Sequence, residues 1–398
     1  MHDVYLVCGR RTPIAKSGGA YRRIRPEVLG AHVLRALCST VPVGREVDGV
    51  IAGNAVGTGG NIARLTALMA GLPASVPAIT LDVQCASGLA AVSAAYAEIA
   101  AGMGTLYLAG GMESASLQPM RIYAPQDERH TQTADGTGAY RTAQFSPDTL
   151  SETVMLEGAE RVMQAEGMTE AELCAWVFES HRRAAHAADA GVLRDLLVPI
   201  AGTAADEGIM RHMNERLLAR LPRPLGKGTL THAGNACRIN DGAAFLLVCA
   251  REALRDLHIE MPVYRIAGTC RYGGSPQESP RGAMRAADLL LFRCGYRCED
   301  MDAIEFNEAF AAIDVLFARA YPHLTERYNV FGGALAYGHP YGASGAVILL
   351  HLMRALEVRR GRYGLAAIAG AGGNVGVGAG VGGMGQAMIL ERVTDEFL

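Results

Sequence analysis

Residues 79–97 read ITLDVQCASGLAAVSAAYA, a short β-type run that is followed by Cys85 and then by a stretch without a charged residue. The residues before the cysteine predict a strand, and those after it predict a buried helix. A cysteine at such a junction faces the free N–H groups at the start of the helix, which favour the nucleophilic thiolate. The small Ala-Ser-Gly that follows would let a substrate come close. The stretch predicts an α/β protein with a candidate nucleophile, although a structural cysteine buried in the core fits the same pattern.

The same alternation of strand and helix extends to both sides of this stretch. Strands are expected at 4–7, 49–51, 78–83, 106–109, 245–249, 263–269, 303–306, 365–369 and 387–393. Helices are expected at 26–37, 61–70, 87–101, 284–292, 308–321 and 344–359. This βαβ rhythm implies a layered α/β fold, and its two separate runs are consistent with a duplicated unit.

The middle of the chain differs from both ends in its polarity and periodicity. Residues 121–148 are polar and lack clear periodicity, which indicates a loop, and helices are expected near 152–166 and 169–190. Because charged residues crowd here, we interpret the region as an inserted, more exposed subdomain. The predicted domains are the first part of an N-terminal half at 1–119, the insert at 120–240, the completion of that half at 241–262 and a C-terminal half at 263–398.

The composition excludes several classes of protein. Half of the 398 residues are hydrophobic and 19 % are charged, which supplies a large core and argues against a disordered chain. A formal net charge of −3 argues against a nucleic-acid partner. The sequence contains neither an apolar run of membrane-spanning length nor a signal-peptide pattern. Nine cysteines without a disulfide-type spacing favour a reducing compartment, so we expect a cytoplasmic protein without a membrane partner.

A second candidate for chemistry lies in FGGALAYGHPYGASG, residues 331–345. His339 is bracketed there by glycine and proline, and a helix is expected to begin at Ser344 or Gly345. A rigid turn of this kind can hold an imidazole as a base. A loop histidine whose hydrogen bonds are all satisfied is the alternative.

The third candidate is Asn307 in EFNEAFA, at a strand end that runs into a helix. Its side chain could cap the helix, which is the ordinary role of asparagine at such a place. Alternatively, its amide orients a water molecule or a carbonyl oxygen in a site.

The glycine-rich tail, 364–385, contains a literal GxGxxG. A dinucleotide fold needs a helix and a strand after that motif, and too few residues follow, so we reject this interpretation. A loop whose backbone N–H groups face an anion or an oxyanion is the alternative. No metal site is expected, because Cys294 and Cys298 have no second pair and His181 and His186 lack matching partners.

Together these segments resemble the thiolase family over nearly the whole chain. The GHPxGASG and NEAFA segments, with the cysteine elbow before them, are the most specific part of the resemblance. Further matching segments are RTPI at 11–14, GNAV at 53–56, AGLP at 70–73, AGGMES at 109–114 and NDGAA at 240–244. The resemblance implies two mixed five-stranded α/β halves in an αβαβα layering, with the insert covering the active site. It also implies a homodimer or homotetramer that uses acyl-CoA in a ping-pong reaction.

The resemblance also assigns roles to individual residues. Cys85 takes the acyl group as a thioester, His339 activates it as a base, and Asn307 positions a water that forms, with His339, an oxyanion hole for the CoA-ester enolate. The Cys85 backbone N–H and a glycine N–H of the tail form the second hole. The residues expected to bind CoA are Arg211, Arg216, Ala233, Cys237, Met155 and Phe310. No metal is expected, and no cofactor beyond the CoA thioester substrates. These roles agree with the residue chemistry, because a thiolate attacks a thioester readily and anionic intermediates need preorganised donors.

The tail departs from the family pattern, which places a second catalytic cysteine in a C-x-G-G-G-[MQ]-G run. Matching the upstream strand puts Ala369 at that position, and matching the last glycines puts Ala379 there. Residues 364–398 contain no cysteine, so this acid/base is absent from its usual place. The glycine donor of the second hole falls on Ala371 or Val381.

Two further departures lie in the insert. In AGNACRINDG, Cys237 stands where a serine is expected near the pantetheine, and Arg238 stands where a glycine is expected. In MLEGAER, Leu156 and Glu157 change what faces the acyl group. Together these changes suggest a specialised or altered thiolase.

The sequence leaves three functions open. The first is an acyl-CoA C-acyltransferase that forms or cleaves 3-ketoacyl-CoA through a Cys85 acyl-enzyme, with Cys237, His232 or water in place of the missing cysteine. The second keeps the acyl-enzyme but passes the acyl group to a different acceptor or to water, which requires no proton from an acetyl methyl. The third is a non-catalytic thiolase-like subunit.

Overall fold

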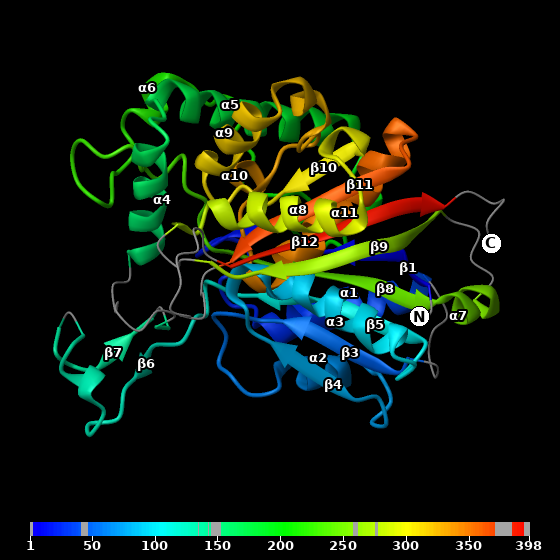
Figure 1. Ribbon diagram of the computed structural model, residues 1–398. Helices are drawn as coiled ribbons and strands as arrows, with labels where there is room; N and C mark the ends of the chain where they lie inside the picture. The colour runs from blue at the N-terminus through cyan, green and yellow to red at the C-terminus, as the bar shows by residue number, and fades with distance from the viewer. Residues whose placement is uncertain are drawn as a thin grey trace.

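The computed structural model describes residues 3–40, 47–133, 135–141, 143–144, 153–257, 262–274, 278–370 and 384–393. Its main sheet has the strand order β10-β11-β12-β9-β1-β8-β5-β3-β4, with β2 beside β8. The strands are β1 (Val4–Arg11), β2 (Ala15–Lys16), β3 (Gly49–Gly53), β4 (Ala78–Leu81), β5 (Leu106–Glu113), β8 (Asn240–Ala250), β9 (Val263–Tyr272), β10 (Ala303–Phe306), β11 (Tyr363–Gly370) and β12 (Met384–Val393). Figure 1 shows the N-terminal strands in the lower part of the molecule and the C-terminal strands in the upper part.

The two halves of the chain repeat one strand arrangement. In the N-terminal half, β3 is parallel to β4 and β5, and β8 is antiparallel to β5 and β1. In the C-terminal half, β10 is parallel to β11, and β12 is antiparallel to β11 and β9. The duplicated α/β unit expected from the sequence is therefore confirmed. The equivalent of β4 is only a single parallel bridge between Ile304 and Tyr328, so within the described residues the C-terminal half lacks a regular fifth strand.

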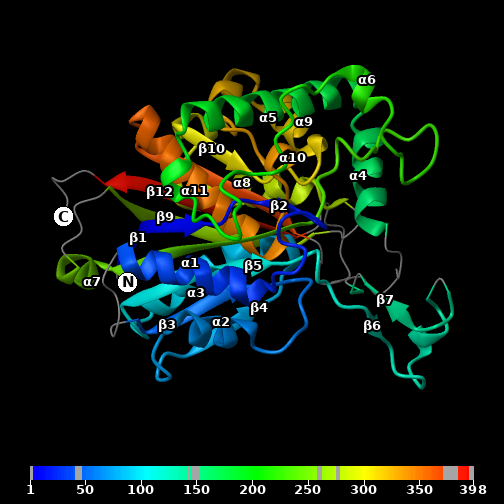
Figure 2. The same ribbon diagram turned by 180° about the vertical axis from the view of Figure 1, so that it is seen from behind.

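The main helices form three layers around the strands. They are α1 (Pro26–Thr40), α2 (Ile62–Ala70), α3 (Ser87–Ala100), α8 (Arg281–Cys294), α9 (Ala311–Ala320) and α11 (Tyr341–Arg359). Helices α3 and α11 lie between the two groups of strands, while α1 and α2 cover the outer face of one group and α8 and α9 that of the other (Figures 1 and 2). This is the αβαβα layering expected from the sequence.

The strand β11 shows why the sequence forms these layers. Ala366 and Ile368 pack into the core that surrounds α3 and α11, whereas Leu365 and Ala367 pack into the core beneath α8 and α9. Alternate side chains of a strand point to opposite faces, so a strand that is covered on both faces needs an unbroken apolar run. The run LAAIA meets that requirement.

Glycines let the starts of α3 and α11 touch. A Cβ on Gly88 would lie 2.8 Å from the carbonyl oxygen of Gly342, and a Cβ on Gly345 would overlap the backbone nitrogen of Leu89. Only glycine allows backbones to approach this closely. The contact brings together two helix N-termini that are far apart in the sequence, and with them the segments that carry Cys85 and His339.

The elements of residues 120–240 lie mostly outside this layered body. They include the small hairpin β6 (Arg121–Ile122) and β7 (Ala139–Tyr140), and helices α4 (Val154–Ala165), α5 (Glu170–Ala190) and α6 (Glu215–Leu218). The hairpin and α4 lie at the same end of the molecule in both views (Figures 1 and 2). The hairpin is a correction to the structureless loop expected at 121–148. The short helices α7 (Arg251–Asp256) and α10 (Ala334–Tyr337) complete the named helices.

Two helix starts also differ from expectation. Helix α9 begins at Ala311 rather than at residue 308, and α11 begins at Tyr341 rather than at Ser344 or Gly345. Helix starts are set by backbone partners outside the helix, which local sequence patterns describe poorly. Among the helices of the described residues, none combines the length and apolarity that a membrane span requires.

Candidate active site

Cys85 lies at a tight elbow between β4 and α3. A short 3₁₀ turn, Gln84–Ala86, connects the two, and Gln84 has a φ of +54°, the left-handed region that side chains other than glycine seldom occupy. The Ser87 hydroxyl holds the turn closed, because it accepts the Val83 N–H at 2.9 Å and donates to the Gln84 carbonyl at 2.6 Å. The elbow expected from the sequence is present, and Cys85 is buried at its tip.

His339 lies in a second tight turn, just before α11. Gly338 has a φ of +102°, and a Cβ there would collide with the side chain of Asn240. The Asn240 amide oxygen accepts the His339 backbone N–H at 3.1 Å. The glycine before the histidine is therefore required both by its backbone conformation and by the contact that holds the turn.

The hydrogen bonds of the His339 ring define its tautomer. Nδ1 lies 2.6 Å from the Ser344 hydroxyl, which donates its single hydrogen to the Pro340 carbonyl at 3.1 Å. With the Ser344 hydrogen assigned to the Pro340 carbonyl, Nδ1 donates to Ser344 and the lone pair is on Nε2. Burial lowers the pKa of His339 to about 3, so the ring is neutral at ordinary pH. These features leave Nε2 unprotonated and able to accept a proton.

Asn307 faces this base. Its Nδ2 lies 3.4 Å from His339 Nε2, which is long for a hydrogen bond and leaves the Nε2 lone pair only weakly engaged. Helix α9 begins at Ala311 with Phe310 as its N-cap residue, so Asn307 does not cap it. Of the two roles open to Asn307, the structure favours the one in which its amide faces a site.

A pocket of about 230 Å³ joins these segments and is largely apolar. Its lining residues are Ala55, Val56, Gln84, Cys85, Gln118, Arg121, Arg141, Ala143, Met155, Leu156, Cys237, Ile239, Ala309, Phe310, His339 and Tyr341. Of the residues expected to bind CoA, Met155, Cys237 and Phe310 line this pocket. Ala233 lines a neighbouring cavity of about 310 Å³, which Cys237 shares.

The two arginines expected to bind CoA lie away from both cavities. Arg211 pairs with Asp189 at 2.7 Å, and Arg216 is exposed on the short helix α6. Neither is among the residues that line the pocket of Cys85 or its neighbour.

Sequence reasoning missed Tyr341, which lines the pocket beside the base. Its ring centroid lies 4.6 Å from that of His339. Burial, together with the nearby Cys85 and Cys237, raises the pKa of the Tyr341 hydroxyl, so it stays protonated. Its place in GHPYGASG, two residues after the histidine, was the available signal.

Two buried glutamates, which sequence reasoning also missed, tie the site together. Glu113 accepts hydrogen bonds from the backbone N–H groups of Ala55 and Gly342, at 3.0 and 2.9 Å. It thereby joins the loop after β3 to the start of α11. Glu308 accepts the Ser180 hydroxyl at 2.5 Å and the Asn329 amide at 2.9 Å. For Glu113 the signal was an acidic residue inside an otherwise apolar segment, LYLAGGME, and for Glu308 it was its place next to Asn307 in EFNEAFA.

Family models match both halves of this chain. The model described as the thiolase N-terminal domain matches residues 4–252, and the model of the thiolase C-terminal domain matches residues 261–392. The chain belongs to the thiolase family. Thiolases are acyl-CoA C-acyltransferases, so the protein is an acyltransferase enzyme, as the resemblance implied.

Individual relatives of this thiolase extend over its full length. VraB of Staphylococcus haemolyticus, provisionally named an acetyl-CoA C-acetyltransferase, is 36 % identical over 98 % of this chain and 99 % of its own. The crystal structure of the Bacillus anthracis acetyl-CoA acetyltransferase has a TM-score of 0.86, with 29 % identity and 99 % of each chain covered. That of human mitochondrial 3-ketoacyl-CoA thiolase also has a TM-score of 0.86, with 27 % identity over 98 % of this chain and 99 % of its own.

The tail of this thiolase is described only in part. Ala369 is buried in β11 opposite Gly385 of β12, and the end of β11 reaches the cysteine elbow, where a Cβ on Gly370 would lie 3.3 Å from the Val83 carbonyl oxygen. Ala379, Ala371, Val381 and the GxGxxG lie outside the described residues.

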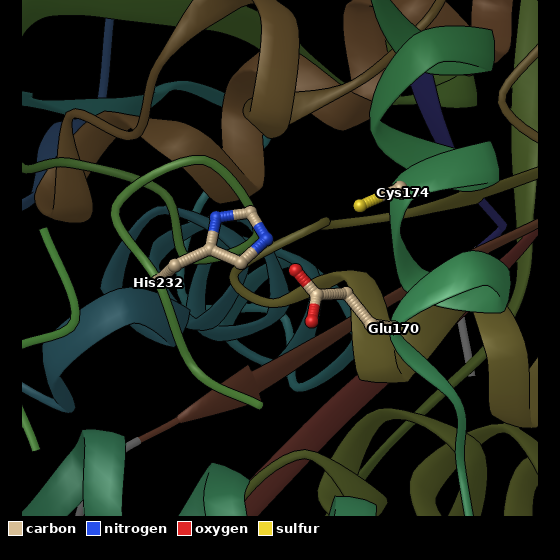
Figure 3. Close-up of side chains that lie close together, drawn as sticks. All are labelled: Glu170, Cys174 and His232. Atoms are coloured by element: carbon tan, nitrogen blue, oxygen red, sulfur yellow. The ribbon is translucent and has the colours of Figure 1, made fainter. Parts of the chain in front are cut away.

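Figure 3 shows a separate group of metal-ligand types, Glu170, Cys174 and His232, whose ligand atoms lie within 4.8 Å of one another. His232 Nδ1 accepts the Gly234 N–H at 3.1 Å, so the neutral ring carries its hydrogen on Nε2, which has no hydrogen-bond partner among the residues that the structure describes. Glu170 already pairs with Arg223 at 2.7 Å. A metal would have to displace both the hydrogen and the arginine, so the group fits a metal poorly. His232 does not line the pocket of Cys85.

Proposed function

We propose that this thiolase forms or cleaves 3-ketoacyl-CoA, with Cys85 as the acyl-carrying nucleophile, His339 as its base and Asn307 as the residue that positions a water in the oxyanion hole. The observation that carries the proposal is a single pocket lined by Cys85 and by a neutral His339, whose Nε2 faces Asn307. The three residues come from three distant segments, and packing alone has no need to bring together a thiol, a base and an amide.

In the cleavage direction, Nε2 of His339 takes the Cys85 proton and the thiolate attacks the 3-keto carbon. The bond between C2 and C3 breaks, the acyl group stays on Cys85 as a thioester, and the electron pair goes to the acetyl-CoA enolate. The now protonated Nε2 and a water positioned by the Asn307 amide are the two donors to the enolate oxygen. Preorganised donors of this kind stabilise the developing charge more than water does.

The pocket supports an acyl-CoA substrate. Its wall contains Met155, Cys237 and Phe310, and the neighbouring cavity with Ala233 provides a continuation for the pantetheine arm. We infer that Arg211 and Arg216 act at the phosphate end of CoA, because guanidinium groups pair well with phosphates. Every step of the proposed reaction is nucleophilic or acid–base chemistry that side chains can perform, so we infer no cofactor beyond CoA itself.

We further infer a homodimer or homotetramer in the cytoplasm. Strand β4 is the edge of the sheet and leaves Ile79 47 % exposed, which suits pairing with a second copy. No disulfide joins any of the cysteines, all of which lie within the described residues, as expected in a reducing compartment.

The proposal is tested by intact-mass spectrometry after mixing the protein with acetoacetyl-CoA, while release of acetyl-CoA is followed. We expect an acetyl adduct on the wild type that free CoA clears with formation of acetyl-CoA, and no adduct on Cys85→Ala. A stable adduct that CoA does not clear would instead indicate a different acceptor. Absence of any adduct would indicate the non-catalytic subunit.

A further inference from the structure

Cys237 is fixed between the two loops that carry His339 and Asn307. Its backbone N–H donates to the Ala309 carbonyl at 2.9 Å, two residues after Asn307. On its other side, the Arg238 carbonyl accepts the His339 N–H at 3.3 Å. The Cys237 side chain lines the same pocket as Cys85. The backbone thus holds this thiol in the wall of the site at a defined place.

The Cys237 thiol is kept protonated. Burial is the main cause that raises its pKa well above the ordinary value for a cysteine, and negative charge on Cys85 or Glu308 acts in the same direction. The group is therefore a neutral acid in a largely apolar pocket, whereas Cys85 is the thiol at the helix N-terminus.

The proposed reaction needs such an acid. When C2–C3 cleavage releases the acetyl-CoA enolate, carbon C2 must gain a proton. The proton on His339 Nε2 is not available for this step, because it is hydrogen-bonded to the enolate oxygen. The sequence contains no cysteine after Cys298, so a thiol from the tail cannot supply it. His232, the other residue considered from the sequence, lies in the group of Figure 3 and does not line this pocket.

We propose that Cys237 donates the proton to C2 of the enolate. The S–H bond of Cys237 breaks, a C–H bond forms at C2, and acetyl-CoA leaves with Cys237 as the thiolate. The incoming CoA thiol returns a proton to Cys237, and the CoA thiolate attacks the Cys85 thioester. Cys85 leaves as a thiolate and recovers its proton from His339, so the cycle closes. In the reverse direction, the Cys237 thiolate removes a methyl proton of acetyl-CoA. This inference rests on the proposed function.

The test compares Cys237→Ser, Cys237→Ala and a control, Cys174→Ser, whose thiol on α5 lies outside the pocket. Acetyl-CoA is incubated with each protein in D₂O, and deuterium in the acetyl methyl is followed by mass spectrometry alongside acetylation of Cys85. We expect both Cys237 variants to lose deuterium incorporation and to cleave acetoacetyl-CoA about 10²–10⁴-fold more slowly, the range for loss of a general acid or base. Acetylation of Cys85 should persist, because it forms no C–H bond.

Each outcome has a distinct meaning. Deuterium incorporation and cleavage at wild-type rates in both Cys237 variants would overturn the role of Cys237 while leaving the Cys85 acyl-enzyme intact. A wild type that does not acetylate Cys85 would instead overturn the proposed function. Equal losses in Cys174→Ser would show that the effect is not specific to the pocket thiol, which also overturns the inference.

Discussion

The Ser344 hydroxyl lies 2.6 Å from Nδ1 of His339 and donates its own hydrogen to the Pro340 carbonyl. The serine thereby orients the imidazole with its lone pair on Nε2, toward Asn307. Ser344 lies in the first turn of α11, directly after the turn that contains His339, so the start of this helix also orients the imidazole.

Ser344→Ala should therefore impair catalysis without removing a reactive group. Loss of a buried hydrogen-bond partner costs about 1–3 kcal/mol, so we expect kcat/KM for acetoacetyl-CoA cleavage to fall about tenfold to a hundredfold. The rate of thiolysis, measured with far-UV circular dichroism to verify folding, checks this. An unchanged kcat/KM would show that the ring is oriented by other contacts.

Asn307→Ala should separate the two halves of the reaction. Loss of an oxyanion-hole donor, here the water that Asn307 positions, typically costs about 10²–10³ in rate, and it should affect the enolate step. We expect slow cleavage of acetoacetyl-CoA with acetylation of Cys85 by acetyl-CoA largely preserved. Single-turnover kinetics measure both steps on the same protein. If both steps slow equally, Asn307 supports the turn of His339 rather than the enolate.

Gly345→Ala should destabilise the fold by separating α3 from α11. The added Cβ would overlap the backbone nitrogen of Leu89, and a buried helix pair cannot move apart without strain of about 1–3 kcal/mol. Gly273→Ala is the matched control, since a Cβ there has no atom of the described residues within 4 Å. Thermal unfolding should give a lower Tm for the first variant only, and equal Tm values would contradict the close packing.

His351 should make the protein less stable in acid. Burial lowers its pKa from an ordinary value near 6.5 to about 3, so between these values the unfolded chain binds a proton that the folded chain does not. Stability from this group is present above pH 6.5 and is lost as the pH falls toward 3. His351→Phe keeps a ring against Tyr337, 5.2 Å between centroids, and should reduce the acid loss measured by denaturant unfolding at pH 7 and pH 5.

The exposed His323 provides the control for this experiment, because its side chain is 59 % exposed and its ion pair with Glu299, at 3.5 Å, is exposed too and so contributes little to stability. His323→Phe should leave the difference in stability between pH 7 and pH 5 unchanged. The prediction fails if both variants respond alike.

Ile79→Lys should weaken self-association if the edge strand β4 pairs with a second copy. The side chain is 47 % exposed on that edge, and a charge on an edge strand opposes pairing. Light scattering after size-exclusion chromatography should show a smaller species. Phe292→Lys, on the face of α8 where the side chain is 85 % exposed, should leave the mass unchanged. If the assembly formed by Ile79→Lys has the same mass as that of the wild type, the interface lies elsewhere on the protein.

The sequence by itself determined the strand and helix pattern, the cysteine elbow and the family. These are local properties: the uncharged run after Cys85 and the glycines around His339 constrain the backbone within a few residues, whatever the rest of the chain does. The predicted starts of α9 and α11 were wrong, because the first residue of each helix depends on backbone partners from other segments.

Only the tertiary structure decided which side chains meet. The contact of Gly345 with the backbone of Leu89 brings the elbow of Cys85 to the turn of His339, and no pattern in either segment encodes that contact. The same holds for Cys237 and His232, which the sequence treated as equivalent. The two residues lie five positions apart in the sequence. The backbone hydrogen bond from Cys237 to Ala309 places Cys237 in the wall of the pocket, whereas His232 lies beside α5, because long-range packing decides which side chains meet.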